Sequence, residues 1–327
     1  MEESPELFVA VVVPTYKRPD LLDRCLAALV VQSLSSARYE VLVADDGPDE
    51  ATLSVVERWR ARAPMHRFRY IPVRATQGPA AARNRAWIAA RAPVIAFTDD
   101  DTIPAPQWLA SGLQAMEPGV AAVSGKVDVP VPRFPTDYER DVEGLARAEF
   151  VTANCFVRRD WLERVGGFDE RFQIAWREDS DLQFALLARG ARVVSAPQAV
   201  VTHPVRPARW GTSIAQQRKV VFDALLYKKY PREYRNRIHR SPPWNYYVIV
   251  AALIVAAVAV AARRPGAAWI SLAVWGALTT EFCVRRLRGC SKDPLHVLEM
   301  IWTSMVIPPA SMFWRIRGAL RFRVLFL

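Results

Sequence analysis

Continuous apolar runs alternate with helically spaced apolar residues along the first hundred positions. The runs predict strands covered on both faces, and the spaced residues predict amphipathic helices between them. The predicted strands are 7–13, 39–44, 68–73 and 93–98, and the predicted helices are 19–32, 50–62 and 79–91. Strands that alternate with helices through short loops form a mostly parallel sheet with helices on both faces. We therefore expect a Rossmann-like α/β fold.

The ends of the predicted strands carry the polar residues of greatest interest. Residues 101–213 are less regular, with helices predicted over 161–165 and 181–189 and a strand over 191–196. In open α/β sheets, ligands bind outside the carboxyl ends of the strands. Those ends hold residues 15–18, 45–46 and 99–101.

The last third of the chain changes character. Trp244–Ala262 contains 19 residues without a charge, which make about 28 Å of helix, enough to cross a bilayer core. A second apolar stretch covers about 267–284 and is interrupted only by Glu281. The alternative is a buried helical hairpin of a soluble protein. We favour two membrane spans because apolar runs of this length are rare in soluble helices.

A third apolar stretch, about 295–314, precedes Arg315, Arg317, Arg321 and Arg323. A full crossing would carry these arginines to the outer side. We therefore expect a re-entrant or interfacial segment here.

The charge is distributed unevenly. The chain has 44 Lys and Arg against 33 Asp and Glu, yet residues 1–213 hold 26 basic and 28 acidic side chains. The positive excess therefore flanks the apolar segments, as expected for a cytoplasmic membrane face in contact with membrane lipids. A nucleic-acid-binding protein would spread it over a folded surface, so we expect no nucleic-acid partner. The sequence predicts a folded domain over 1–213, a basic juxtamembrane linker over 214–243 and a membrane region over 244–327.

Asp99-Asp100-Asp101 form the strongest chemical signal, because they follow an apolar strand directly. Three adjacent carboxylates repel one another unless a cation compensates them. Mg²⁺ or Mn²⁺ is commonly held by one or two carboxylates together with substrate phosphates. The alternative is a solvated acidic loop without a ligand.

A second acidic group, Glu178-Asp179-Ser180-Asp181, opens a predicted helix behind Trp176. Acidic residues in a first turn serve as ordinary helix caps. A carboxylate near a reacting centre would instead accept the proton of a hydroxyl. Spacing alone leaves both interpretations open.

A third segment, Gly78 to Asn84, places small residues at a helix start. Small residues allow close approach of a ligand, and Arg83 could reach a diphosphate. The alternative is a tightly packed helix N-terminus.

Taken in order, these segments resemble family-two inverting glycosyltransferases of the GT-A fold. The resemblance rests on Val11–Arg18, Val41–Gly47, Gly78–Asn84, Asp99–Asp101, the stretch from Asn154 to Glu170, and Glu178-Asp179. It spans roughly residues 7–205, and the ordered set is more specific than any one motif.

The resemblance implies a role for each matched residue. The nucleotide would be held by Thr15, Tyr16, Arg18, Asp45, Asp46, Arg83 and Asp99. The metal, Mg²⁺ or Mn²⁺, would be bound by Asp99, Asp101 and His203. Asp179 would be the general base, and the acceptor side would be shaped by Asn154, Trp176 and Glu178.

The resemblance further implies an enzyme that transfers a sugar from a nucleotide-diphosphate donor, which we expect to be a UDP-sugar. The acceptor would be a lipid-linked or membrane-bound hydroxyl. The region around Gln216 lacks the Q-x-x-R-W motif of processive synthases, so we expect addition of a single sugar. The catalytic domain would face the cytoplasm from a multi-pass anchor, in a bacterial inner membrane. The alternatives are a nucleotidyltransferase and a non-catalytic membrane scaffold with vestigial motifs.

Overall fold

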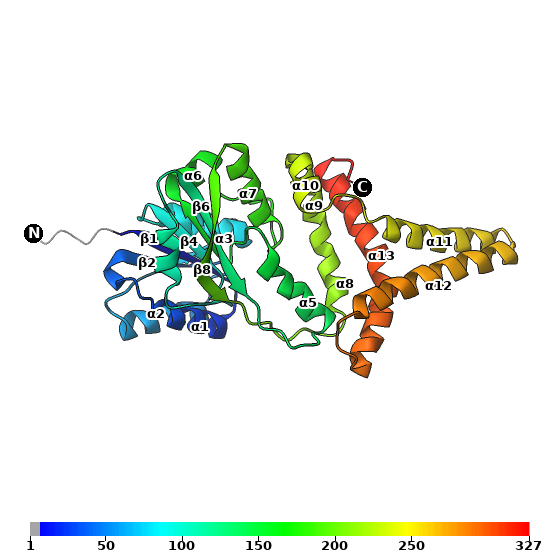
Figure 1. The fold of residues 1–327 in the computed structure, drawn as a ribbon, viewed down its shortest axis with the longest axis horizontal. Coiled ribbons are helices and arrows are strands. Elements are labelled where there is room, and N and C mark those ends of the chain that lie inside the picture. The colour runs from blue at the N-terminus through cyan, green and yellow to red at the C-terminus, as the bar shows by residue number, and fades with distance from the viewer. Residues whose placement is uncertain (1–6, 327) are drawn as a thin grey trace, which may run out of the picture. The chain divides into compact units, whose positions relative to one another are not determined.

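The computed structural model describes residues 7–326 and divides into two compact units (Figure 1). The first unit comprises the residues up to Pro130 together with Gly144–Val205, and the second comprises Val131–Glu143 and the residues from Arg206 onward. The contribution of 131–143 to the second unit was not anticipated from the sequence. The functional assignment of 1–213, 214–243 and 244–327 stays a prediction.

The first unit is built on a sheet of eight strands in the order β3-β2-β1-β4-β7-β6-β8-β5. The strands are β1 (Val9–Thr15), β2 (Tyr39–Asp45), β3 (Arg67–Pro72), β4 (Val94–Thr98), β5 (Ile103–Pro104), β6 (Val120–Asp128), β7 (Asn154–Arg158) and β8 (Arg192–Thr202). The first four strands pair in parallel, as predicted. β7 runs antiparallel to both of its neighbours, whereas β8 is parallel to β6 and antiparallel to β5. The sheet is therefore parallel in its first half and mixed in its second.

Helices cover both faces of this sheet, as the sequence predicted. They are α1 (Pro19–Leu29), α2 (Glu50–Arg62), α3 (Pro79–Ala89), α4 (Trp108–Gln114), α6 (Arg159–Val165) and α7 (Glu178–Ala188). Short 3₁₀ turns occupy Ser36–Arg38 and Gly144–Arg147. The helix predicted over 181–189 begins earlier, at Glu178, so that the acidic pair lies in its first turn.

Alternate residues of β1 enter two separate hydrophobic cores. Val9, Val11 and Val13 pack with α1, α2 and α4, whereas Ala10 and Val12 pack with α3, α6 and α7. Side chains of a strand point alternately to the two faces of a sheet, so a strand buried on both faces is apolar throughout. All seven residues of β1 are buried for this reason.

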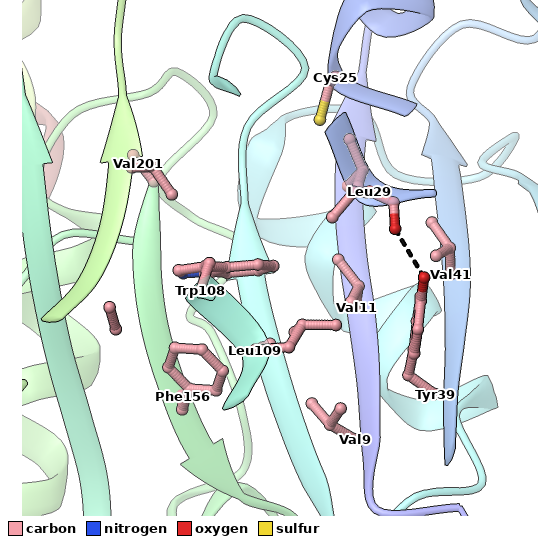
Figure 2. Close-up of a cluster of buried hydrophobic side chains, with 14 of the residues drawn as sticks. Val9, Val11, Cys25, Leu29, Tyr39, Val41, Trp108, Leu109, Phe156 and Val201 are labelled. Atoms are coloured by element: carbon pink, nitrogen blue, oxygen red, sulfur yellow. Dashed lines mark hydrogen bonds between the residues drawn. The ribbon is translucent and has the colours of Figure 1, made fainter. Parts of the chain in front are cut away.

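Figure 2 shows the first of these cores, which contains buried residues from both halves of the sheet. The rings of Trp108 and Phe156 lie 5.2 Å apart between centroids. On the parallel side, the hydroxyl of Tyr39 donates a 2.6 Å hydrogen bond to the backbone carbonyl of Leu29. A buried hydroxyl without such a partner would destabilise the fold.

The second unit is helical. Its helices are α5 (Asp137–Glu143), α8 (Thr212–Gln216), α9 (Val220–Lys229), α10 (Pro231–Arg237), α11 (Trp244–Ala261), α12 (Pro265–Leu287) and α13 (Pro294–Phe322), with a 3₁₀ turn at Gln217–Lys219. α11 and α12 run side by side, in yellow and orange in Figure 1. Both are long and apolar enough to cross a membrane by length and composition.

The apolar surface of this hairpin faces outward. Only 17% and 22% of the most apolar windows of α11 and α12 are buried, and side chains such as Ile254, Val258, Trp269 and Ile270 are exposed. A core hairpin of a soluble protein would bury these side chains. The exposure therefore disfavours that alternative and weakly supports membrane association.

α13 corrects one expectation. Residues 294–322 form one continuous helix through Pro308 and Pro309, so the predicted re-entrant turn does not occur. One face of α13 packs against α9 and α12, which holds the helix together across the two prolines. The alternative, an interfacial helix, stays a prediction.

We predict that Gly112→Ala destabilises the first unit by about 1–3 kcal/mol, because it overpacks the core. A Cβ at Gly112 would lie 2.1 Å from the ring of Phe156, which is completely buried and has no space to move. Urea denaturation of the full chain measures the change. At Gly144 a Cβ meets nothing within 4 Å, so Gly144→Ala is the matched control. Equal stability of the two variants would contradict the packing that we describe.

Candidate active site

Three strands of the parallel half end side by side and bring the predicted polar residues together. Thr15 is the last residue of β1, Asp45 is the last residue of β2, and the acidic triplet from Asp99 to Asp101 follows β4 directly. β1 lies between β2 and β4, with Thr15 opposite Asp45. The candidate donor residues therefore share one edge of the sheet, whereas their chemical roles stay predictions.

Asp100 is the most deeply buried residue of the triplet and ties it to β1. Its Oδ2 accepts a 2.7 Å hydrogen bond from Oγ1 of Thr15, and its Oδ1 lies 3.3 Å from Arg18. The same nitrogen of Arg18 lies 3.3 Å from Oδ2 of Asp101. Burial raises the pKa of Asp100 to about 7 although Arg18 opposes the shift. The loops after β1 and β4 are thus joined through these side chains.

Arg83 of α3 is buried between two carboxylates from distant parts of the chain. Its Nη2 donates to Oδ1 of Asp99 at 2.8 Å, and its Nη1 donates to Oε1 of Glu178 at 3.0 Å. Only 2% of Arg83 is exposed. Burial alone would lower the pKa of this guanidinium, but the two carboxylates raise it above its ordinary value. Arg83 therefore remains charged and links the end of β4 to the start of α7.

The start of α7 presents Glu178 and Asp179 from a strained backbone. Arg177, directly before the helix, has a φ of +74°, a left-handed conformation that is uncommon for a residue other than glycine. Oδ1 of Asp179 accepts a 2.6 Å hydrogen bond from the backbone N–H of Ser180.

Burial raises the pKa of both carboxyl groups of this pair. At Glu178 the guanidinium of Arg83 opposes the shift, and the neighbouring Asp179 adds to it. At Asp179 the N–H of Ser180 and the charge of Arg177 oppose it. A carboxylate with a raised pKa is a stronger proton acceptor than an ordinary one, as a general base requires.

Asp45 and Asp46 organise the loop after β2. Oδ2 of Asp45 accepts a 2.7 Å hydrogen bond from the hydroxyl of Tyr70, and its Oδ1 accepts the N–H of Gly47 at 3.2 Å. Oδ1 of Asp46 accepts the N–H of Gly78 at 2.8 Å. Asp46 therefore fixes the N-terminus of α3 relative to β2.

Tyr16 offers an exposed aromatic face beside this loop. Its ring is 48% exposed and packs on Gly47, where an added Cβ would lie 2.6 Å from Cε2. The ammonium of Lys17 lies 5.3 Å from the ring centroid. An exposed ring supported from behind is suited to stacking on a planar base.

Asn84 joins two of the segments that carry the family resemblance. Its Nδ2 donates to the carbonyl of Phe168 at 2.9 Å and to Oε1 of Glu170 at 3.0 Å. Its Oδ1 accepts the N–H of Phe168 at 2.9 Å. Gly167, with φ +69°, approaches so closely that a Cβ would lie 2.6 Å from this oxygen.

His203 follows β8 and lies next to the acidic triplet. Its Nε2 is 3.4 Å from Oδ1 of Asp101, and its buried Nδ1 has no hydrogen-bond partner among residues 7–326. Within the same range there is no group of three or more His, Cys, Asp or Glu side chains arranged to hold a metal ion. Asp101 and His203 nevertheless fit a divalent cation that takes its remaining ligands from substrate phosphates.

The structure corrects the expectation for Asn154. Asn154 is completely buried; its Oδ1 accepts the indole N–H of Trp108, and its Nδ2 donates to the carbonyls of Lys126 and Ala199, all at 2.8 Å. With its amide fully occupied, Asn154 supports the sheet and does not reach an acceptor. Trp176 remains partly exposed, with the guanidinium of Arg177 4.4 Å from its ring centroid.

Sequence reasoning left Asp100 and Arg177 without individual roles. Asp100 carried no signal that separates it from its neighbours, because its burial depends on contacts with Thr15 and Arg18, which are distant in the sequence. Arg177 carried no signal, because nothing in an arginine predicts a positive φ.

The fold places the chain among GT-A proteins. It is similar to the mannosyltransferase PcManGT from Pyrobaculum calidifontis, solved in complex with GDP-Man and Mn²⁺, with a TM-score of 0.64 and 22% sequence identity. The similarity covers 94% of this chain and 86% of PcManGT.

The sequence then identifies the family. The model of glycosyl transferase family 2 matches residues 10–166, and that of glycosyl transferase family group 2 matches residues 94–314. Because the second match covers more than half of the chain, this chain belongs to glycosyltransferase family 2. This membership favours sugar transfer over the nucleotidyltransferase and scaffold alternatives.

Three individual relatives match this chain over part of its length. Glycosyltransferase AglE of Haloferax volcanii is 28% identical over 215 residues, which are 61% of this chain and 68% of AglE. Succinoglycan biosynthesis protein ExoM of Rhizobium meliloti is 30% identical over 216 residues, 61% of this chain and 67% of ExoM. Validoxylamine A glucosyltransferase of Streptomyces hygroscopicus subsp. limoneus is 30% identical over 222 residues, but these are 56% of this chain and about half (48%) of that protein.

We predict that Arg83→Lys lowers kcat/KM for sugar transfer by at least about tenfold, because an ammonium cannot bridge two carboxylates as a planar guanidinium does. Steady-state kinetics of the full chain measures the loss. Arg85→Lys is the matched control, since Arg85 is exposed on the same helix. Unchanged kinetics in Arg83→Lys would show that the bridge is unimportant for catalysis.

Proposed function

We propose that this glycosyltransferase transfers one sugar, with inversion, from a nucleotide-diphosphate donor to an acceptor hydroxyl. The observation that carries the proposal is the double ion pair of Arg83 with Asp99 and Glu178. It connects the acidic triplet, where the donor phosphates would bind, to the helix that carries the candidate base. Donor and base are thereby held at one site.

The nucleotide would occupy the ends of β1, β2 and β4. Tyr16 would stack on the base, and Thr15, Asp45 and Asp46 would shape its surroundings. Arg18 and Arg83 carry positive charge toward the acidic triplet, where a diphosphate would add acceptor oxygens for guanidinium groups. We infer a UDP-sugar, with a GDP-sugar as the second donor to test because PcManGT was solved with GDP-Man.

A divalent cation would be held by Asp101 and His203, with Asp99 close by. The proximity of His203 to Asp101 and the unpartnered Nδ1 support this assignment. When bound, Mg²⁺ or Mn²⁺ supplies Lewis-acid stabilisation of negative charge on the departing diphosphate.

Asp179 would accept the proton of the acceptor hydroxyl while that oxygen attacks the anomeric carbon. The bond to the diphosphate breaks on the opposite side of the carbon, so the configuration inverts. The raised pKa of Asp179 supports this role. Glu178, held by Arg83, would keep the start of α7 in place.

The acceptor would be lipid-linked or membrane-associated. The two outward-facing apolar helices and the basic residues at their ends support a membrane anchor with the catalytic unit on the cytoplasmic side. The missing Q-x-x-R-W motif supports transfer of a single sugar.

We predict that Asp179→Asn reduces sugar transfer by at least about a thousandfold and leaves nucleotide affinity within about threefold, because the amide retains the shape but accepts no proton. The assay is release of UDP or GDP from a panel of nucleotide sugars, with membrane lipid extract as acceptor, with and without a chelator. Asp160→Asn, at an exposed position of α6, is the control. Full transfer by Asp179→Asn would refute the assignment of the base.

A pH profile gives a second test. The active form of Asp179 is the deprotonated one, so kcat should fall as the pH drops through its pKa. Because burial raises that pKa, the fall should begin above the range of an ordinary aspartate, whose pKa is about 3.9. The pKa values of Asp100 and Glu178 are raised as well. The contribution of Asp100 is removed in Asp100→Asn, and the remaining fall belongs to the interacting pair of Glu178 and Asp179. A profile of Asp100→Asn that stays flat down to about pH 4 would contradict the prediction.

A further inference from the structure

One arginine of the second unit is buried without a counter-charge among the residues that the structure describes. Arg315 of α13 is 8% exposed, and its Nε is buried without a hydrogen-bond partner. Among residues 7–326, its side chain makes no ion pair, and its described contact is with the ring of Phe326, 4.7 Å from the guanidinium. An unpaired buried guanidinium is costly, because its lost hydration is not replaced.

The carboxylate of Asp137 is paired with another buried arginine. Arg286 of α12 lies 2.7 Å from Oδ2 of Asp137 and donates to the hydroxyls of Thr303 and Ser304 at 2.8 and 3.0 Å. Arg286 is therefore satisfied within the protein. Arg315 is equally buried, and its Nε has no partner among residues 7–326.

Several arginine side chains act electrostatically on the start of α11. The phenol of Tyr246, in the first turn of α11, is within electrostatic reach of Arg285, Arg286 and Arg315, and of the carboxylate of Asp137. Its ring contacts that of Phe282 at 5.3 Å, which fixes this end of α11 against the end of α12. Three guanidinium groups thus act electrostatically on one phenol at the basic end of the apolar hairpin.

Two further buried polar atoms without a partner lie on α12, and both can donate a hydrogen bond. The buried Nε1 of Trp275 and Oγ1 of Thr279 have no partner in the described part of the chain. By helical spacing, these two residues share a face with Phe282 and Arg286, the face that contacts α11 and reaches α13. The missing component is an acceptor.

The outer face of α13 indicates where that acceptor comes from. Exposed apolar side chains recur at helical spacing along it: Leu295, Leu298, Trp302, Phe313, Ile316 and Leu320. These residues lie opposite the buried face that includes Arg315. An apolar outer face next to basic residues is typical of a helix at the surface of a membrane.

We propose that Arg315, together with Tyr246 and Arg285, binds the phosphate group of an anionic lipid. A phosphate supplies several acceptor oxygens and more negative charge than a carboxylate, and its geometry matches a guanidinium. This lipid-binding proposal rests on the proposed function and extends it, because it names phosphate as the group through which the protein holds a lipid-linked acceptor. Binding itself does not depend on catalysis.

The test uses the full chain in neutral detergent and measures the shift in melting temperature and the Kd with four probes: farnesyl phosphate, farnesol, phosphatidylglycerol and inorganic phosphate. We expect farnesyl phosphate to stabilise the protein, and farnesol and inorganic phosphate at the same concentration to leave it unchanged. Phosphatidylglycerol distinguishes the sources: if it binds as well, the site accepts membrane phospholipid, and if it does not, the site requires a phosphate monoester. Either result supports a lipid phosphate.

Arg315→Met is the decisive variant. It should weaken farnesyl phosphate binding at least about tenfold and should raise the melting temperature without lipid, because it removes an unpaired buried charge. Arg315→Lys, which keeps the charge, serves if the methionine variant fails to fold, and should also weaken binding. Arg317→Met is the matched control, because Arg317 is exposed two residues away.

Three results would overturn the proposal: undiminished lipid binding in Arg315→Met, a lower melting temperature of that variant without lipid, or equal stabilisation by inorganic phosphate. Nucleotide binding measured in the same preparations separates the two proposals. Lipid binding that persists when Asp179→Asn and the parent chain both fail to transfer sugar would place the fault in the proposed function and not in this site.

Discussion

The candidate active site depends on the burial of one guanidinium. Buried Arg83 is stabilised at its position by Asp99 and Glu178, and the buried carboxylate of Glu178 is in turn stabilised by the charge of Arg83. The three residues come from a helix start, a strand end and a second helix start, so these ion pairs fix three elements in one arrangement. Asp100 extends it to β1 through Thr15 and Arg18. A change at any of these positions therefore affects the geometry of the whole site.

The helical unit contains two buried arginines that differ in whether a carboxylate among the described residues pairs with them. Arg286 and Asp137 satisfy each other, although Asp137 belongs to the segment that leaves the catalytic unit at Pro130. Arg315 is as deeply buried as Arg286, and no carboxylate among residues 7–326 pairs with it. Where the chain supplies both charges, the pair holds helices together. Where the described residues supply only the cation, the proposed lipid phosphate would supply the missing negative charge.

Family membership and geometry contribute different parts of the functional conclusion. Membership in glycosyltransferase family 2 establishes the reaction class. The geometry adds which carboxylates face which cations, why Asp179 is a stronger proton acceptor than an ordinary aspartate, and why Asn154 is structural. The outward-facing apolar helices add a reason to look for an acceptor in the membrane.

Local patterns in the sequence were sufficient for the parallel half of the sheet, its covering helices and the position of the acidic triplet, because periodicity and strand ends depend on neighbours along the chain. They were also sufficient for the apolar hairpin. Tertiary structure alone decided the antiparallel second half, the burial of Asn154, the pairing of Arg83 with Glu178 across 95 positions, the continuity of α13 and the isolation of Arg315. Each of these features depends on which residues, distant in the sequence, are buried next to one another. Whether buried charges are compensated is therefore decided by the packing of the whole chain.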